Sequence, residues 1–308
     1  MKVLVTGGTG MLGSSFKKVK TDHELVLVGS ADYDLRRGSD CRCMIADHHP
    51  DAIIHLAARV GGVKGNTDYV ADFFHENIMM NSNLLDAAKN QNVPKVVSLL
   101  STCVYPDTVT YPLTEDQIHN GEPHKSNFGY AYAKRMLEVH SRAIRQQYGL
   151  NYITAVPNNL YGPYDNFDLE NGHVLPAIIR KAKESKDSEK EMVLWSSGRA
   201  LREFTYSQDI AEILLFLLEN YDDPEPINIG NTNEISIQQV AEIICREMGY
   251  SGDTLWDLSK PEGQYRKPSD NSRLLKLGWK KENYTPLYRG IKMTCRWFLK
   301  NYPNVRGV

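Results

Sequence analysis

The chain has 308 residues, of which 41% are hydrophobic and 24% charged, and its mean hydropathy is −0.45. This length suits one large domain or two modest ones, and a formal charge of −2 provides no basic surface to hold nucleic acid or an anionic membrane. No apolar run approaches the roughly 20 residues of a membrane helix, and a strand starting at the N-terminus leaves no room for a signal peptide. The five cysteines lack paired zinc spacing, so we expect free thiols in a reducing cytoplasm and no metal site: Cys41, Cys43, Cys103, Cys245 and Cys295.

The first half of the chain alternates short apolar runs with helical patterns. Strands are predicted at 2–6, 24–28, 52–56, 96–100 and 153–157, and helices at 11–19, 69–91 and 130–148. The segment 39–49 is a poor helix by pattern and is expected to be a loop-rich crossover. Apolar strands separated by helices are typical of βαβ units, in which helices cover both faces of a parallel sheet.

Regularity breaks after Leu160, where Gly162-Pro163 and Asn171-Gly172 are turn signals. A helix at 207–219 and a strand at 226–229 indicate a return to the main sheet. Further helices are predicted at 236–248 and 286–299, the last with Thr285 as N-cap and Pro286 as its first residue.

The predicted fold class is therefore α/β, a Rossmann doubly wound parallel sheet with a smaller, discontinuous α/β substrate lobe. Residues 1–160 plus about 202–231 should form the Rossmann domain, and about 161–201 plus 232–308 the lobe. The lobe should close over the carboxyl edge of the sheet, where open α/β sheets bind ligands.

The string VTGGTGMLG gives Gly7, Gly10 and Gly13 a GxxGxxG spacing at the first strand-to-helix turn. Such glycines allow a tight turn, close approach of a pyrophosphate, and close packing of helix on strand. The alternative is a glycine-rich turn without a ligand. At the end of the second strand Ser30 stands where NAD binders usually carry an acid, so no carboxylate repels a 2′-phosphate and NADP(H) is favoured. Arg36 and Arg37 follow closely and could assist.

Tyr130 and Lys134 are four residues apart on a predicted helix and so share one face. A lysine beside a phenol is expected to lower the pKa of that phenol and to make it a useful proton donor or acceptor. The same spacing recurs at Tyr288 and Lys292, which we interpret as a surface coincidence. Ser101 ends a buried strand and could orient the same carbonyl oxygen, or simply cap the strand.

Ser101, Tyr130 and Lys134 together with the glycine loop resemble the short-chain dehydrogenase/reductase superfamily. TGGTG, HLAA at 55–58 and NLYGP at 159–163 resemble its extended branch, which mostly acts on nucleotide sugars. His55 is interpreted as a hydrogen-bonded residue at a strand end and not as a catalyst. The resemblance implies an NADP(H) site made of Gly7, Gly8, Thr9, Gly10, Met11, Leu12, Gly13, Ser30, Leu56, Ala57, Leu99, Leu100, Tyr130, Lys134, Pro157, Asn158, Asn159, Leu160 and His173.

The residues after Ser101 narrow the chemistry. A sugar 4,6-dehydratase of this superfamily would carry an Asp-Glu pair where this chain has Thr102 and Cys103, and a 4-epimerase would have no use for a thiol there. A thiol can act as a base when neighbouring cations or dipoles favour the thiolate. His173 lies between an Asn-Gly turn and an apolar run, and it is either a second catalyst or a hydrogen-bonded loop residue.

The strings STCVYP, NFGYAYAKRM, DNF, GHVLP and REFTYSQD together resemble the GDP-L-fucose synthase family, over essentially the whole chain. The resemblance implies 3,5-epimerisation of GDP-4-keto-6-deoxy-D-mannose, followed by NADPH-dependent reduction of the 4-keto group. It implies Cys103 as the base, His173 as the acid, and Ser101, Tyr130 and Lys134 as the remaining catalytic residues.

The same resemblance implies a GDP-sugar site made of Ser101, Asn159, Lys181, Trp195, Arg202 and Asp270. Three of these have plain structural alternatives: an ion pair for Arg202, a solvated lysine for Lys181 and a core aromatic for Trp195. Asn158 departs from the family, in which threonine is frequent at this position, so its own contact is less secure than that of Asn159.

Helices near 69–91 and 130–148 are expected to pair across a two-fold axis in a homodimer, or else only to pack on the sheet. Two other functions stay open. One is a 4-epimerase or 4-reductase acting on another nucleotide sugar, and the other is a catalytically idle NADP-sensing module. The second is disfavoured because such modules usually lose the tyrosine or the lysine.

Overall fold

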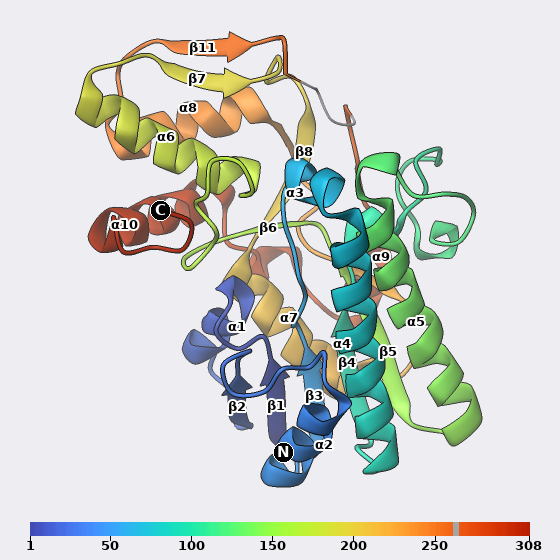
Figure 1. The fold of residues 1–308 in the computed structure, drawn as a ribbon. Helices are drawn as coiled ribbons and strands as arrows, with labels where there is room; N and C mark the ends of the chain where they lie inside the picture. The colour runs from blue at the N-terminus through green and yellow to red at the C-terminus, as the bar shows by residue number, and fades with distance from the viewer. Residues whose placement is uncertain (261–264) are drawn as a thin grey trace.

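The computed structural model describes residues 1–260 and 265–308 (Figure 1). Six parallel strands form the main sheet in the order β2-β1-β3-β4-β5-β9, with the bounds β1 Lys2–Thr6, β2 Glu24–Val28, β3 Ala52–His55, β4 Lys95–Leu99, β5 Asn151–Pro157 and β9 Ile227–Ile229. The strand order reverses between β1 and β3. The loops that follow these two strands therefore open a crevice at the carboxyl edge, where α/β sheets bind ligands.

Helices cover both faces of this sheet, as the alternation of strands and helices predicted. One face carries α1 (Met11–Ser15), α7 (Ser207–Asn220) and α9 (Ser272–Leu277), and the other carries α2 (Gly38–His48), α4 (Val70–Asn90) and α5 (Phe128–Tyr148). Successive side chains of one strand point to opposite faces. Val3 and Val5 of β1 accordingly pack in the first core, whereas Leu4 packs in the second.

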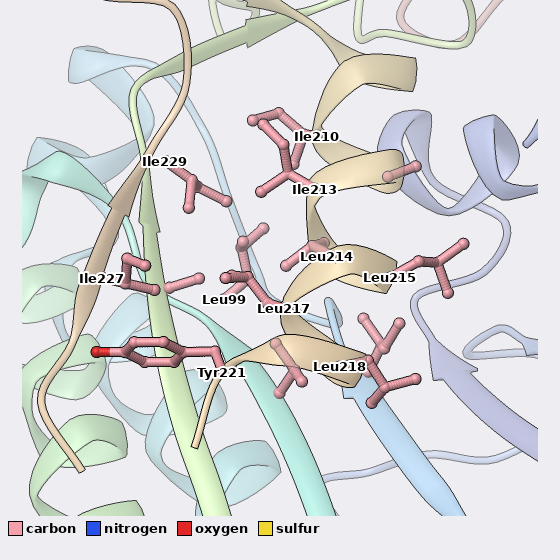
Figure 2. Close-up of a cluster of buried hydrophobic side chains, with 14 of the residues drawn as sticks. Leu99, Ile210, Ile213, Leu214, Leu215, Leu217, Leu218, Tyr221, Ile227 and Ile229 are labelled. Carbon is pink, nitrogen blue, oxygen red and sulfur yellow. The ribbon is translucent and has the colours of Figure 1, made fainter. Parts of the chain in front are cut away.

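The first core is centred on α7, which is apolar along almost its whole length. Ile210, Ile213, Leu214 and Leu217 point from this helix toward Leu99, Ile227 and Ile229 of the sheet (Figure 2). These side chains are nearly all inaccessible to solvent, so each contributes on the order of 1.5–3 kcal/mol through burial. The late return of the chain to the sheet, predicted from its last apolar strand, is therefore a major part of the core.

The expected loop at 39–49 is wrong, because this segment is the helix α2 (Gly38–His48). Its sequence is polar overall, but Cys41, Met44 and Ile45 follow helical spacing and are buried in the second core. Burial of these three side chains along one side of the helix stabilises it, although its other sides face solvent. The pattern was too sparse to be read from the sequence.

After β5 the chain builds a second lobe and then returns. This lobe contains the sheet β10-β8-β6, the pair β11-β7 and three helices, with the bounds β6 Asn159–Tyr161, β7 Met192–Trp195, β8 Leu201–Tyr206, β10 Glu234–Ser236, β11 Thr254–Asp257, α6 Val174–Ser188, α8 Ile237–Met248 and α10 Leu287–Asn301. It has its own apolar core and lies beyond the carboxyl edge of the main sheet (Figure 1). No helix among the described residues combines the length and the apolar character needed to cross a membrane.

The start of α10 differs slightly from expectation. The helix begins at Leu287 with Pro286 as its N-cap. Thr285 does not cap it: its backbone N–H and its hydroxyl both donate to the carboxylate of Asp209, at 2.8 and 2.7 Å. This buried carboxylate ties α10 to α7 and thus the lobe to the main sheet.

Candidate active site

The glycine loop is packed so tightly that side chains are excluded from it. Gly7 has φ +70°, in the left-handed region that favours glycine, and a Cβ there would lie 2.9 Å from the backbone nitrogen of Ala57. A Cβ on Gly8 would lie 2.8 Å from the nitrogen of Val28, and one on Gly13 would collide with the carbonyl oxygen of Gly7. The loop therefore sits in the crevice between the ends of β1, β2 and β3, and the structure fits the backbone cradle expected for a pyrophosphate.

The end of β2 presents the groups that would meet an adenosine ribose. Ser30 is exposed, as its proposed role requires. Asp32 lies two residues further on, but its carboxylate folds back and accepts a 2.8 Å hydrogen bond from the backbone N–H of Gly29. Arg36 is paired with Asp34 at 2.9 Å, which lowers the pKa of that carboxyl. Arg37 lies 3.8 Å from the same carboxylate, and its side chain is 72% exposed.

Lys134 is buried on α5, where its ammonium donates a 2.6 Å hydrogen bond to the carbonyl oxygen of Leu99 at the end of β4. Burial lowers the pKa of Lys134 to about 7. Its other N–H donors are not used by any hydrogen bond among the described residues. They can serve the hydroxyls of a cofactor ribose, so the residue fits the role that the resemblance implies.

Tyr130 lies one turn before Lys134, with the Lys134 Nζ 6.0 Å from the centroid of its ring. The expectation that Lys134 lowers the pKa of this phenol is wrong. Burial and the charge of Cys103 raise the pKa of Tyr130, and a side-chain hydrogen bond with Ser101 only partly opposes them. The lysine points past the ring to Leu99. A phenol with a raised pKa stays protonated at neutral pH, which suits a proton donor.

Ser101 and Cys103 form one turn directly after β4. Ser101 is the N-cap of a short 3-10 helix at 102–104, and its hydroxyl oxygen accepts a 3.3 Å hydrogen bond from the backbone N–H of Cys103. Cys103 is half-buried and its charge acts on Tyr130. The structure thus brings together Ser101, Tyr130 and Cys103, as the sequence predicted, and places a thiol beside the tyrosine hydroxyl.

Lys267 also belongs to this site, and reasoning from the sequence missed it. It lines a small cavity together with Cys103, His124 and Asn127. The surrounding protein and Arg202 lower the pKa of Lys267, and the charge of Cys103 opposes them. The amide oxygen Oδ1 of Asn127 is buried in this region without a described hydrogen-bond partner. No spacing in the sequence links the segment at 265–271 to Cys103, so only the fold reveals this neighbour.

His173 lies in the second lobe, as the N-cap of α6. Its side chain is open to solvent, yet the protein around it lowers its pKa, and the Arg306 guanidinium lowers it further. A helix N-terminus also disfavours a cation. These effects favour the neutral imidazole. No described hydrogen bond joins His173 to Cys103 or Tyr130.

Lys181 and Trp195 lie side by side, with the ammonium 5.6 Å from the centroid of the ring. Trp195 is 44% exposed at the end of β7, so the alternative of a core aromatic is wrong. Lys181 also donates a 2.8 Å hydrogen bond to the carbonyl oxygen of Val193. A second lysine, Lys260, lies 5.4 Å from the same ring and was not expected from the sequence.

Arg202 and Asp270 differ in the support that the structure lends them. Arg202 lies on β8 and its charge reaches Lys267, which connects it to the Cys103 cavity. The carboxylate of Asp270 instead accepts a 2.7 Å hydrogen bond from the backbone N–H of Ser272, at the start of α9. This bond closes a local turn around Asn271, the N-cap residue of α9.

Asn158 and Asn159 are held by β8. Asn158 is buried and satisfied by protein: its amide donates to Glu203 at 3.3 Å, and its oxygen accepts from Thr205 at 2.7 Å. Asn159 is exposed and donates to the carbonyl oxygen of Glu203 at 2.8 Å. Asn158, where the family frequently has threonine, therefore takes part in a buried hydrogen-bond network with Glu203 and Thr205. Asn159 is the exposed residue of the two and can contact a ligand.

Two residues set aside on the sequence behave as expected. His55 is fully buried and bonded on both ring nitrogens, to Thr6 at 2.8 Å and to Asn81 at 3.0 Å. Tyr288 is 64% exposed on α10, far along the chain from the nucleotide half, and Lys292 is 3.9 Å from Glu247. The second Tyr-x-x-x-Lys pair is a surface feature.

Comparison with known proteins agrees with this site. Residues 3–230 match the model of the NAD dependent epimerase/dehydratase family. The chain is 42% identical to a GDP-L-fucose synthase of Dictyostelium discoideum, which covers 99% of this chain and 97% of that one, and 37% identical to a GDP-L-colitose synthase of Yersinia pseudotuberculosis, covering 99% and 100%. A GDP-L-fucose synthetase of Naegleria fowleri, solved bound to NADP, superposes with a TM-score of 0.93 at 40% identity, over 99% of this chain and 94% of that one.

Proposed function

This chain belongs to the NAD dependent epimerase/dehydratase family, in the branch that holds the GDP-L-fucose synthases, and on that premise we propose its reaction. It epimerises GDP-4-keto-6-deoxy-D-mannose at C3 and C5 and then reduces the 4-keto group with NADPH, to yield GDP-L-fucose. The observation that carries the proposal is the thiol of Cys103 beside Ser101 and Tyr130. A simple reductase or 4-epimerase needs the tyrosine and the serine but has no task for the thiol.

The cofactor of this reaction is NADP(H). Two features support this: the glycine cradle between β1, β2 and β3, and the Naegleria fowleri relative bound to NADP. The proposed binding residues are the set named from the resemblance, with the backbone of Asn158 in place of its side chain. When bound, NADPH supplies the hydride for the ketone carbon C4. Ser30 and Arg37 are exposed where a 2′-phosphate would lie.

Epimerisation needs one group to remove a proton and another to return one on the opposite face. The 4-keto group acidifies the C–H bonds at C3 and C5, so a thiolate of Cys103 can take such a proton while the electron pair moves to the ketone oxygen. Ser101 and Tyr130 donate hydrogen bonds to the enolate oxygen. His173 as an imidazolium then delivers a proton from the other side and becomes neutral.

Reduction uses the same oxygen-binding groups. As the hydride reaches C4, the oxygen becomes an alkoxide and takes the hydroxyl proton of Tyr130, whose raised pKa keeps that proton in place beforehand. Lys134 stabilises the resulting phenolate through its nearby ammonium and holds the cofactor ribose. One site can therefore run both reactions without moving the sugar.

The nucleotide sugar is bound by Lys181, Trp195, Arg202 and Asn159 on elements of the second lobe, and by Ser101 on the turn after β4. An exposed tryptophan beside lysine offers stacking and positive charge, and arginine pairs bidentately with phosphate. Asp270 completes the proposed set, and its carboxylate also accepts the backbone N–H of Ser272. The proposed division is residues 1–160 plus about 202–231 for NADP(H) and about 161–201 plus 232–308 for the nucleotide sugar. It is modified at two places, because β6 and β8 lie in the second lobe and α9 packs on the main sheet.

A homodimer through helices near 69–91 and 130–148 completes the proposal. The two helices lie side by side, since a Cβ on Gly129 would be 2.8 Å from the carbonyl oxygen of Val70. Phe74 on α4 and Met136 and Val139 on α5 are exposed. Size-exclusion chromatography with light scattering of Met136→Lys tests this, since a charge at a two-fold interface should yield monomers.

A reducing cytoplasm is the compartment that suits this protein. All five cysteines are free thiols, and Cys103 must remain so to act.

The decisive experiment supplies GDP-4-keto-6-deoxy-D-mannose and NADPH in deuterated water and identifies the product by NMR. We expect NADPH oxidation, deuterium at C3 and C5, and GDP-L-fucose as the product. Oxidation without deuterium uptake would exclude the epimerase half and favour a 4-reductase. Because one relative is named for GDP-L-colitose, the 3-deoxy substrate analogue is run in parallel, and faster turnover of that analogue would reassign the substrate.

Two variants separate the steps. Cys103→Ser and His173→Gln should each lower deuterium uptake by at least about 100-fold, the typical contribution of an acid–base group, while NADPH binding is unchanged. Unaltered exchange in both would refute their roles. NADPH binding without any turnover of a 4-keto sugar would support the sensing module instead.

A further inference from the structure

The loop at 162–173, which carries His173, contacts two other segments of the chain, one on each side. On one side the backbone N–H of Gly62, at the start of α3 (Val63–Asp68), donates a 2.9 Å hydrogen bond to the carbonyl oxygen of Asn171. On the other side lies the segment 302–308, which follows α10. This loop contains no helix or strand, so its contacts with these two segments determine the position of the imidazole.

The segment 302–308 makes specific contacts with this loop and with α6. The N–H of Phe167 donates to the carbonyl oxygen of Arg306 at 2.9 Å, and the Arg180 guanidinium donates to the carbonyl oxygen of Gly307 at 2.6 Å. Gly307 has φ +89°, and a Cβ there would collide with Asn166 and with the backbone of the loop. Val305 anchors the segment, since it is 8% exposed and belongs to the apolar core of the lobe.

These contacts bring the Arg306 guanidinium close enough to act on two titratable groups of the loop. The surrounding protein lowers the pKa of His173, and the charge of Arg306 lowers it further. At Asp165 the same charge opposes the rise in pKa that burial causes. Asp165 is buried, burial raises its pKa to about 7, and its Oδ2 atom has no described hydrogen-bond partner. The packed elements carry further charged groups, which include Lys64 and Asp68 of α3, Asp168 and Glu170 of the loop, and Arg180, Lys181, Lys183, Glu184, Lys186 and Asp187 of α6.

We propose that the segment 302–308 is a clamp for the His173 loop and that Arg306 is a positioning residue, which sets both the place and the charge of the imidazole. The proposal rests on the acid role of His173 proposed above. Without substrate, the charge of Arg306 adds to the effect of the surrounding protein and disfavours the imidazolium form of His173. A substrate that carries a diphosphate brings negative charge to the lobe, which offsets Arg306 and allows the imidazole to take up a proton from solvent. Protonation of the acid is thereby coupled to the presence of an anionic substrate.

The test measures the titration of His173 directly and without substrate. Protein labelled with ¹³C-histidine is titrated by NMR, and the His173 signal is the one of nine that His173→Gln removes. Arg306→Gln should raise the midpoint by roughly 0.5 to 1 pH unit, as expected for removing a neighbouring charge at a surface site. Arg306→Lys should stay near the wild-type value. Arg296→Gln, which removes an arginine from exposed α10 surface, is the matched control and should not shift it.

Gly307→Ala tests the clamp apart from the charge, because it keeps Arg306 but forces the segment off the loop. Like Arg306→Gln, this variant should raise the midpoint of the His173 titration. An unchanged midpoint in Arg306→Gln would overturn the role of Arg306, and an unchanged midpoint in Gly307→Ala would overturn the clamp.

A second readout separates this inference from the proposed function. The pH dependence of deuterium uptake should move upward in Arg306→Gln and be restored in Arg306→Lys. A shifted NMR midpoint with unaltered uptake in His173→Gln would leave the clamp intact and refute only the acid role. A shift in neither measurement would refute the clamp whatever reaction the enzyme performs.

Discussion

The ammonium of Lys134 and the carbonyl oxygen of Leu99 are joined by a 2.6 Å hydrogen bond that is buried from solvent. It links the second turn of α5 to the last residue of β4. The turn with Ser101 and Cys103 follows directly after Leu100. The cation, the strand end and the catalytic turn therefore form one rigid unit at the carboxyl edge of the sheet.

The first prediction concerns the pH dependence of reduction. Burial lowers the pKa of Lys134 to about 7, from an ordinary value of 10.5, so the ammonium is lost as the pH rises through 7. Since kcat/KM reports the free enzyme, it should fall above about pH 7, and Lys134→Met should lower it at least about 100-fold. Initial rates of NADPH oxidation measure this. Lys292→Met, in the surface copy of the motif, is the control, and equal losses in both variants would contradict the assignment.

The second prediction concerns Lys267 and the thiol of Cys103. The two side chains share a cavity and attract each other, so Lys267→Met should slow alkylation of Cys103 by iodoacetamide at pH 7 several-fold, because the thiolate is the reactive form. Peptide mass spectrometry measures the rate, with exposed Cys43 as an internal reference. Lys276→Met is the control variant. A Cys103 rate equal to that of wild type would remove Lys267 from the site.

The third prediction concerns the glycine cradle. Gly13→Ala puts a Cβ against the carbonyl oxygen of Gly7, where backbone must move, so NADPH affinity should fall at least about tenfold, equivalent to about 1.4 kcal/mol. Gly38→Ala is the control, since its Cβ would meet its neighbours at 3.4 Å or more. Calorimetric titration with NADPH compares the two. Wild-type affinity in Gly13→Ala would show that the cofactor does not use this loop.

The fourth prediction concerns acid stability. Burial, helped by Lys134, lowers the pKa of His55 to about 3, against 6.5 for a free histidine. Between these values the unfolded chain binds a proton that the native one does not, so the free energy of unfolding should fall as the pH drops from about 6.5 toward 3, by up to about 1.4 kcal/mol per pH unit. Urea unfolding at several pH values measures this slope.

His55→Gln is the matching variant. It should be destabilised at pH 7, by about 1–3 kcal/mol for the lost buried hydrogen bonds to Thr6 and Asn81. Its acid slope should be shallower than that of wild type. The same slope in both proteins would assign the acid sensitivity to other groups.

Much of the fold could be predicted because its signals are local. Strands β1 and β2 have the predicted bounds, and the other predicted strands and long helices lie within two residues of theirs. Buried parallel strands are continuous apolar runs, and α7 is apolar almost throughout. The helix α2 was not predicted, because its few buried residues are separated by many polar ones. Its stability comes from packing on α4 and the sheet, which the sequence pattern does not show.

The features of the candidate site likewise fall into those set by local sequence and those set by the tertiary fold. The sequence by itself determined the glycine loop, the pairing of Tyr130 with Lys134 and the thiol after Ser101, because each is a spacing within a single turn or helix. Only the tertiary structure decided which charges surround those groups. Lys267 meets Cys103 and Arg306 meets His173 through contacts between segments that lie far apart in the chain. Burial, which also exists only in the fold, raises the pKa of Tyr130 where the sequence predicted a decrease. A local motif names the reacting groups, but the long-range packing around them sets their protonation.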